Sequence, residues 1–256
     1  MARSVTARAA LAVGAVVVLV GAATACASAS DDQDPDHKSF AVKGGTLTID
    51  SDDSDLEIVA ADAHPAGKIE VTRWFKGSVL IGKDPKVTWS MKDGDRLVLR
   101  TQCSGFVANC ATRHRVEVPR GIAVKVEGDD GGVRASGFTH ALSIHTNDGP
   151  VRVSDSTGPL ELRSDDGAVH ADVRSRHVSA HTADGSVSLT FGVVPDTVDS
   201  GSDDGSVTVE VPRATYRVTT KTDHGSVRVD VPRDDRSTHR ISATTGDGNV
   251  TVRPVG

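Results

Sequence analysis

Acidic residues that recur in a short bend are the side chains of this sequence best placed to do chemistry. The acidic residues are Asp129, Asp130, Asp148, Asp165, Asp166, Asp184, Asp203, Asp204 and Asp223, and the neutral Asn147 occupies the position before Asp148. Stacked oxygen ligands of this kind can bind calcium. The glycine-rich nonapeptide of calcium-binding β-rolls is absent, however. We therefore interpret the acidic bends as Asx-type turns that face solvent, and we expect no metal site.

Neither the spacing of the histidines nor any common catalytic motif predicts an active site. His145 and His181 occupy the same repeat position two repeats apart, about 9.6 Å at the spacing of neighbouring strands. Such a pair cannot share a zinc ion without further donors, because zinc ligands lie about 2 Å from the metal. No GxSxG motif, HExxH motif, P-loop or dinucleotide fingerprint is present. We expect no catalytic residue, no cofactor and no enzymatic activity.

The three cysteines indicate an oxidising compartment and a possible anchor. Cys103 and Cys110 flank the segment SGFVAN and could pair as a disulfide outside the cytoplasm. Cys26 follows Ala23-Thr24-Ala25, which resembles a bacterial lipobox, although leucine is usual where Ala23 stands. We predict lipidation of Cys26. The same residues also fit an A-x-A cleavage site, which would give a soluble secreted protein.

The acidic bends belong to a short sequence motif that occurs seven times between Val124 and Val252. Each copy ends its bend with a glycine, and successive glycines are 18, 18, 18, 20, 20 and 23 residues apart. A nearly fixed period of this length predicts a stacked repeat architecture. The bend glycines are Gly131, Gly149, Gly167, Gly185, Gly205, Gly225 and Gly248.

Each repeat shows the alternation of half-buried strands on both sides of its bend. Valine stands two residues after every bend glycine, and a small or branched apolar residue stands four after it. Polar residues lie between them, which predicts a strand, a bend, a second strand and a return connection. A Ser or Thr usually precedes the glycine by three residues. We interpret this hydroxyl and a left-handed glycine as a turn device.

Two all-β folds fit such a unit. The first is a single-stranded β-solenoid with coils of 18–20 residues, in which equivalent residues of successive coils stack. The alternative is an antiparallel β-meander, in which each Asp-Gly forms a hairpin turn. The fixed period favours the solenoid, because a meander does not require its hairpins to be alike.

The sequence divides into four parts. Residues 1–25 have a basic start and an apolar run, which predicts a signal peptide. Residues 26–39 are small, polar and acidic, which predicts a flexible tether. Residues 40–121 hold strand-like segments, a hairpin at Asp93-Gly94 and most of the aromatic residues, which predicts an irregular β cap with a disulfide loop. Residues 122–256 are predicted to form the solenoid.

Net charge argues against nucleic acid as a partner. Without Arg3 and Arg8 of the predicted signal peptide, 27 basic and 35 acidic residues leave a charge of −8. An acidic exported protein without a basic stretch is a poor nucleic-acid binder.

Four features together resemble a known family. They are VTWSMKDGDRLVLR, the loop CSGFVANC, RVEVPRGIAVKVE and the serial DG-x-V units. This combination is similar to the DUF4097 group of toastrack-type, adhesin-like β-repeat domains, and it spans Phe40 to Val252. The resemblance implies a β-solenoid on an exported or membrane-attached protein, in some cases one linked to envelope stress. It supplies no catalytic residues.

These features predict a lipoprotein on the extracytoplasmic face of the cell membrane. We expect a non-catalytic module that binds or scaffolds, either adhesin-like or envelope-sensing, with an unidentified envelope protein or glycan as its partner. One alternative is a rigid spacer without a specific ligand. Another is a carbohydrate-active enzyme, although the short returns between coils leave little chain to build a pocket.

Overall fold

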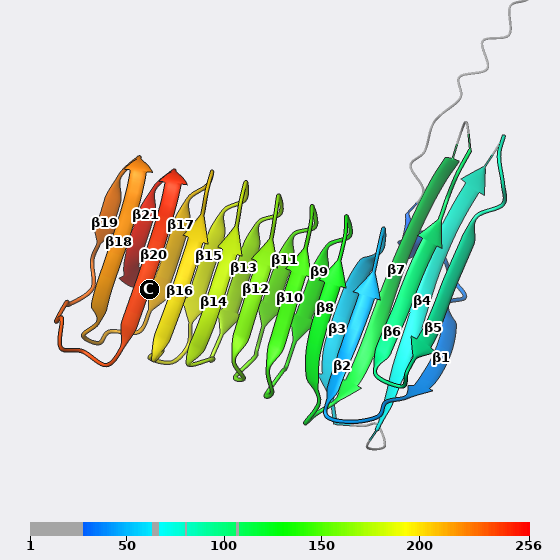
Figure 1. The fold of residues 1–256 in the computed structure, drawn as a ribbon, viewed down its shortest axis with the longest axis horizontal. Helices are drawn as coiled ribbons and strands as arrows, with labels where there is room; N and C mark the ends of the chain where they lie inside the picture. The colour runs from blue at the N-terminus through cyan, green and yellow to red at the C-terminus, as the bar shows by residue number, and fades with distance from the viewer. Residues whose placement is uncertain (1–27, 63–66, 80, 106–107) are drawn as a thin grey trace, which may run out of the picture.

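The computed structural model describes residues 28–62, 67–79, 81–105 and 108–256. Cys26 and the predicted signal peptide lie outside the described residues, so lipidation and export remain predictions. The described chain forms two long sheets that face each other and are joined coil by coil (Figure 1). The predicted all-β class is confirmed. No helix in these ranges has the length and apolar character needed to cross a membrane.

The first sheet has, in the described residues, eleven strands in the order β1-β4-β7-β3-β9-β11-β13-β15-β17-β21-β19. We call it sheet A. Its strands are β1 (Asp36–Ala41), β3 (Asp55–Ala61), β4 (Lys68–Val79), β7 (Ala108–Pro119), β9 (Val133–Ser136), β11 (Val151–Ser154), β13 (Val169–Val173), β15 (Val187–Phe191), β17 (Val207–Val211), β19 (Val227–Val229) and β21 (Val250–Pro254).

The second sheet, sheet B, has ten strands within the described ranges, in the order β18-β20-β16-β14-β12-β10-β8-β2-β6-β5. Its strands are β2 (Thr46–Ser51), β5 (Lys86–Lys92), β6 (Arg96–Gln102), β8 (Ala123–Gly128), β10 (Leu142–Thr146), β12 (Leu160–Ser164), β14 (His177–Thr182), β16 (Thr197–Ser202), β18 (Arg217–His224) and β20 (Arg240–Asp247). A short 3₁₀ helix, η1 (Ala29–Asp31), precedes both sheets.

Strand pairing settles the choice between solenoid and meander. Val151 of β11 pairs with Val133 of β9 on one side and with Val169 of β13 on the other, all in parallel. The two strands of one repeat lie in opposite sheets, so the bend turns a corner and does not close a hairpin. Equivalent residues of successive repeats therefore stack directly. The predicted β-solenoid is confirmed, and the meander is wrong for the repeats.

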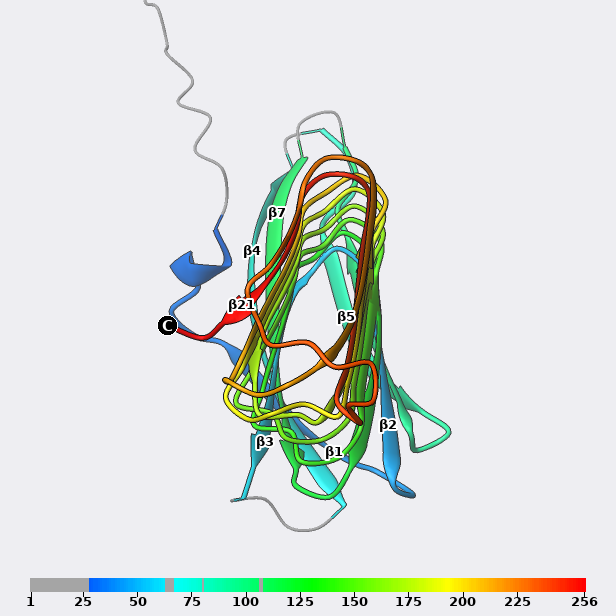
Figure 2. The same cartoon turned by 90° about the vertical axis from the view of Figure 1, so that its left-hand side faces the viewer.

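The core lies between the two sheets, as the view along the stack shows (Figure 2). Inward residues from both sheets are almost fully buried; in one coil these are Leu160 and Leu162 of β12 with Val169 and Ala171 of β13. Full burial of a valine or leucine side chain stabilises a fold by about 1.5–3 kcal/mol. The outward residues between them are polar, so each strand has one buried face and one solvent-exposed face.

The N-terminal end is closed by strands outside the repeat, as the aromatic content predicts. β4 and β7 pair antiparallel and extend sheet A, while β5 and β6 form a hairpin that extends sheet B. The hairpin turn lies at the predicted position, with Asp93 and Gly94 at φ 55° and 88°. A turn with positive φ at two successive residues favours the pair Asp-Gly, which explains the residue types found here.

Two predicted boundaries shift. β1 begins at Asp36 and pairs with β4, so the last residues of the predicted tether 26–39 form a strand. β2 and β3 were included in the predicted cap, but β2 pairs with β8 and β3 pairs with β9, both in parallel. They form the first regular coil of the solenoid, because Leu47, Ile49, Leu56 and Ile58 supply the same inward positions as the later repeats.

The last two repeats exchange places. β20 pairs with β16 on one side and with β18 on the other, and β21 likewise lies between β17 and β19. The final coil in the sequence is thus inserted before the penultimate one, which forms the end of the stack (Figure 1). Tyr216 is fully buried in the return that leads into β18, and its hydroxyl donates to the Pro212 carbonyl at 2.7 Å.

Candidate functional site

Buried hydroxyl groups connect the bends of successive coils. Thr146 Oγ1 donates to the Gly149 carbonyl of its own coil, and Ser164 Oγ of the next coil donates to the same oxygen. Thr182 Oγ1 donates to the Gly167 carbonyl at 2.9 Å, and the pattern continues through Ser202. The predicted Ser/Thr turn device is therefore mainly a bond between coils, which satisfies carbonyls that would otherwise be buried without a partner.

The bend glycines are needed for a different reason from the predicted one. Five of the seven do not have a positive φ, and the other two, Gly225 and Gly248, have φ 150° and 154°. A Cβ on Gly149 would instead lie 2.1 Å from the Gly131 carbonyl oxygen of the preceding coil. On Gly185 it would lie 2.4 Å from the Gly167 oxygen. Close stacking of backbone on backbone excludes any side chain here.

This stacking places the carboxylates of successive bends along one long edge of the solenoid, which we call the acidic edge. It consists of Asp52, Asp53, Asp129, Asp130, Asp148, Asp165, Asp166, Asp184, Asp203 and Asp204. Burial raises the pKa of Asp166 above its ordinary value, and the charges of Asp184, Asp148 and Asp165 raise it further. The carboxylates therefore repel one another along the edge.

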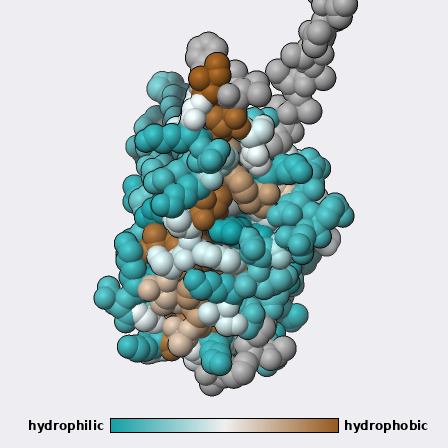
Figure 3. Space-filling view, turned by 90° about the vertical axis from the view of Figure 1, so that its right-hand side faces the viewer, coloured by the Kyte–Doolittle hydropathy of each residue, from teal (hydrophilic) through white to brown (hydrophobic). Residues whose placement is uncertain are grey.

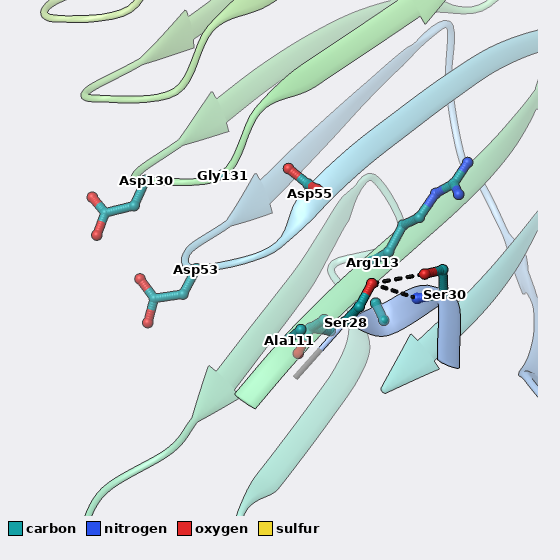
Figure 4. Close-up of a pocket in the computed structure, with 10 residues that line it drawn as sticks. Ser28, Ser30, Asp53, Asp55, Ala111, Arg113, Asp130 and Gly131 are labelled. Atoms are coloured by element: carbon teal, nitrogen blue, oxygen red, sulfur yellow. Dashed lines mark hydrogen bonds between the residues drawn. The ribbon is translucent and has the colours of Figure 1, made fainter. Parts of the chain in front are cut away.

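A groove of about 520 Å³ lies where the acidic edge meets the cap. Asp53 and Asp130 project from successive bends, and Asp55 lies between them and Arg113 (Figure 4). Burial raises the pKa of Asp53 above its ordinary value, and the charges of Asp52, Asp130 and Asp129 raise it further. The other wall holds Arg113 and the start of η1. The groove is therefore open and lined by both acidic and basic side chains.

Metal-binding geometry is not seen in the described part of the chain. No group of three or more His, Cys, Asp or Glu residues there is placed to hold a metal ion. His145 and His181 flank Arg163 on neighbouring strands, which is the predicted separation of two coils. Their Nε2 atoms lie 3.9 Å from Asp165 and 3.4 Å from Asp199, respectively. The two histidines thus have separate acidic neighbours.

Aromatic residues of the cap are covered by cations of the same chain. The Arg73 guanidinium lies 4.5 Å from the centre of the Trp89 ring, and Lys38 Nζ lies 4.8 Å from that of Phe40. Phe40 and Trp89 also meet edge to face, with ring centres 6.4 Å apart. Apolar surface remains visible at this end, broken up by polar side chains (Figure 3), and Ile81 is 67% exposed. The rings mainly close the solenoid.

A buried histidine in the cap was not singled out by the sequence. His114 is fully inaccessible, its Nδ1 lies 3.1 Å from Ser54 Oγ, and its Nε2 has no partner. Burial lowers the pKa of His114 to about 3, with a further contribution from the positive charge of Arg73. Its alternation with Val116 and Val118 on β7 was the signal that placed it inside.

The predicted disulfide is present. Cys103 and Cys110 are bonded, with their Cα atoms 6.2 Å apart, and they connect the end of β6 to the start of β7. Since β6 belongs to sheet B and β7 to sheet A, the bond ties the two sheets together in the cap.

Ion pairs neutralise most charges on the outer faces near the cap. Arg96 binds both Asp50 and Glu127, at 2.5 and 2.7 Å, across three strands of sheet B. On sheet A, Glu57 binds both Arg113 and Arg115. Exposed pairs contribute little each, but they show how charges are matched between neighbouring strands.

The family model for Toastrack DUF4097 matches residues 45–253. The chain belongs to this family. The match covers the first coil, the cap strands β4 to β7 and all later coils, which agrees with the resemblance expected from the sequence.

Two solved structures are similar to this Toastrack protein at low identity. A "putative adhesin" from Bacteroides fragilis is 16% identical, with a TM-score of 0.50, and the match covers 90% of this chain and 100% of that one. A "putative adhesin" from Parabacteroides merdae is 14% identical with a TM-score of 0.47, covering 88% and 97%. Among curated proteins no match was found.

Proposed function

We propose that this Toastrack protein is a non-catalytic binding or scaffolding module of the cell envelope, held at the outer face of the membrane by lipid on Cys26. The observation that carries the proposal is the pair of broad outer faces, on which parallel pairing holds side chains of successive coils in fixed rows. Such a surface presents a repeated pattern to an extended partner without rearrangement. The adhesin description of the Bacteroides fragilis protein, which shares the fold, supports the same class of function.

The proposed anchor fits the position of the first described residues. η1 contacts β4 and β7 of the cap, and the Asp32 carboxylate accepts a hydrogen bond from the Phe75 amide at 3.0 Å. Cys26 lies three residues before Ala29, so a lipid there would hold the cap end towards the membrane. The repeats would then extend away from the anchored end, with both outer faces accessible.

The anchor is tested by Cys26→Ser in cells that export the full chain. We expect the wild-type protein in the membrane fraction with a lipid mass increment at its N-terminus, and the variant in the soluble fraction. Unchanged membrane association of the variant would show that Cys26 is not the anchor.

The binding role is tested by comparing the adhesion of two kinds of cell. One displays the full chain, and the other displays an unrelated lipoprotein at the same level. We expect cells with this protein to adhere more strongly to immobilised envelope glycans or envelope proteins. Equal adhesion to every surface would favour the alternative of a rigid spacer.

A further inference from the structure

Two arginines on sheet A are stacked on each other, and neither forms an ion pair in the described part of the chain. Arg134 of β9 and Arg152 of β11 are direct partners in parallel register, and His170 of β13 follows in the same row. All three side chains are exposed, and none forms an ion pair or side-chain hydrogen bond in the described part of the chain. Their Cα atoms are about 4.8 Å apart along the row, a spacing at which like charges destabilise a sheet.

The neighbouring acids do not neutralise this pair. Glu57 is the direct strand neighbour of Arg134, but its carboxylate is bound by Arg113 and Arg115. The equivalent row on sheet B differs, because Arg163 lies between His145 and His181 and has no second arginine beside it. Two adjacent guanidiniums without an ion-pair partner can bind an oxyanion, since each offers a planar fork of donors.

A shallow groove adjoins the arginines. It has a volume of about 460 Å³ and is lined by Arg134, Arg152, His170, Ser136 and Ser154, with Glu57 and Asp172 at its borders. Ser136 and Ser154 are paired in register and lie two residues beyond the arginines on the same outer face. That separation is about 6.6 Å along a strand, comparable to the length of one sugar ring. Hydroxyl groups of a sugar would meet the serines while its acidic group meets the arginines.

Surrounding charge restricts the ligand to a low density of negative charge. The positive row is short, the groove ends at Asp172, and the acidic edge with Asp148 begins at the N-terminal end of β11. A polymer with a negative charge on every unit would lie against these carboxylates and be repelled.

Resting on the proposed binding role, we propose that this groove binds one carboxylate of a sugar chain in which acidic units are separated by neutral ones. Arg134 and Arg152 hold the carboxylate between them, His170 extends the donor row, and Ser136 and Ser154 bind ring hydroxyls. The glycan runs across the strands of sheet A. No covalent step is involved.

The test titrates the purified full-length lipoprotein, in detergent, with a hexasaccharide in which glucuronate alternates with N-acetylglucosamine. We expect Arg134→Gln and Arg152→Gln each to weaken binding by about 10-fold, or about 1.4 kcal/mol. Arg163→Gln on sheet B is the matched control, since it removes the same charge from the opposite face, and its affinity should equal that of the wild type.

Several outcomes would overturn the assignment. These are no binding by the wild type, equal loss in the control variant, equal binding of a neutral N-acetylglucosamine hexasaccharide, or tighter binding of polygalacturonate, which is charged on every ring. Displacement of the hexasaccharide by millimolar inorganic phosphate, with tighter binding of phosphate itself, would also overturn it. If displayed Arg152→Gln still supports cell adhesion as wild type does, the groove proposal fails while the broader binding role stands.

Discussion

At the scale of single residues, the bend glycines show how backbone contact between coils selects a residue type. The carbonyl of one bend glycine lies beneath the next, and a hydroxyl from Ser or Thr bonds to the same carbonyl. Because each bend contacts the bend of the preceding coil and that of the following coil, one substitution disturbs contacts on two sides. The interior hydroxyl is buried as deeply as the valines, so it depends on that carbonyl as its acceptor.

Gly167→Ala is expected to be strongly destabilising. Its Cβ would lie 2.3 Å from the Gly149 oxygen and 2.6 Å from Ser164 Oγ, so the coils must separate. We expect a loss of about 1–3 kcal/mol or more in the free energy of unfolding, measured by urea denaturation. Gly45→Ala is the control, because a Cβ there meets nothing within 4 Å. Similar stabilities of the two variants would contradict the stacking explanation.

His114 is expected to make the fold sensitive to acid. Its pKa is lowered to about 3 by burial, whereas in the unfolded chain it is about 6.5. Below pH 6.5 the unfolded state therefore binds a proton that the folded state does not. This lowers the free energy of unfolding by up to about 1.4 kcal/mol per pH unit, until the folded pKa is reached.

His114→Leu removes this term while keeping an apolar side chain of similar size, and Ser54 retains its hydrogen bond to Ser51. Between pH 7 and pH 4 the variant should lose about 3 kcal/mol less stability than the wild type. Carboxylates titrate in both proteins and cancel in the comparison. Parallel stability curves in urea unfolding at several pH values would show that His114 is protonated without cost.

At the scale of elements, the final repeat is inserted between two earlier ones. Sequence similarity among repeats permits this, since any coil presents the same inward apolar pattern and the same bend to its neighbour. The longer return between β19 and β20, residues 230–239, provides the chain needed to pass back around the end coil. The glycine spacing of 23 residues before the last bend reflects this extra length.

The exchanged order predicts which cysteine pairs will crosslink. Asp199 and Thr219 are each direct partners of Ser242, so they lie two strands apart, about 9.6 Å. In a background without Cys103 and Cys110, Asp199→Cys with Ser242→Cys should form a disulfide rapidly under mild oxidation. Asp199→Cys with Thr219→Cys should not, because the separation exceeds the reach of about 6.8 Å. Efficient bonding of the second pair would mean that the coils follow the sequence order.

At the scale of the whole molecule, the solenoid has a strongly acidic long edge and mixed charge elsewhere. Each bend adds carboxylates to this edge. Burial raises the pKa values of Asp53 and Asp166, and repulsion by the neighbouring carboxylates raises them further. Screening by salt should therefore stabilise the protein. This repulsion is the consequence of repeating one turn sequence in a stack.

Monovalent salt and calcium should act alike on this edge. We expect sodium chloride to raise the melting temperature, and millimolar calcium at matched ionic strength to add no more than about 2–4 °C, which corresponds to about 1 kcal/mol. Magnesium serves as the control for divalent charge alone. A rise of about 10 °C with calcium and not with magnesium, read by differential scanning calorimetry, would instead establish a specific calcium site.

The sequence alone determined the repeating unit, the inward residues and the bends, because burial follows a period of two and each coil repeats it. It also located the Asp93-Gly94 hairpin, whose turn chemistry is local. Tertiary structure decided the rest. The role of the glycines, the coil order and the groove at Arg134 and Arg152 depend on which coils become neighbours. Similar repeats encode how coils stack but not in which order, so only the folded chain settles these contacts.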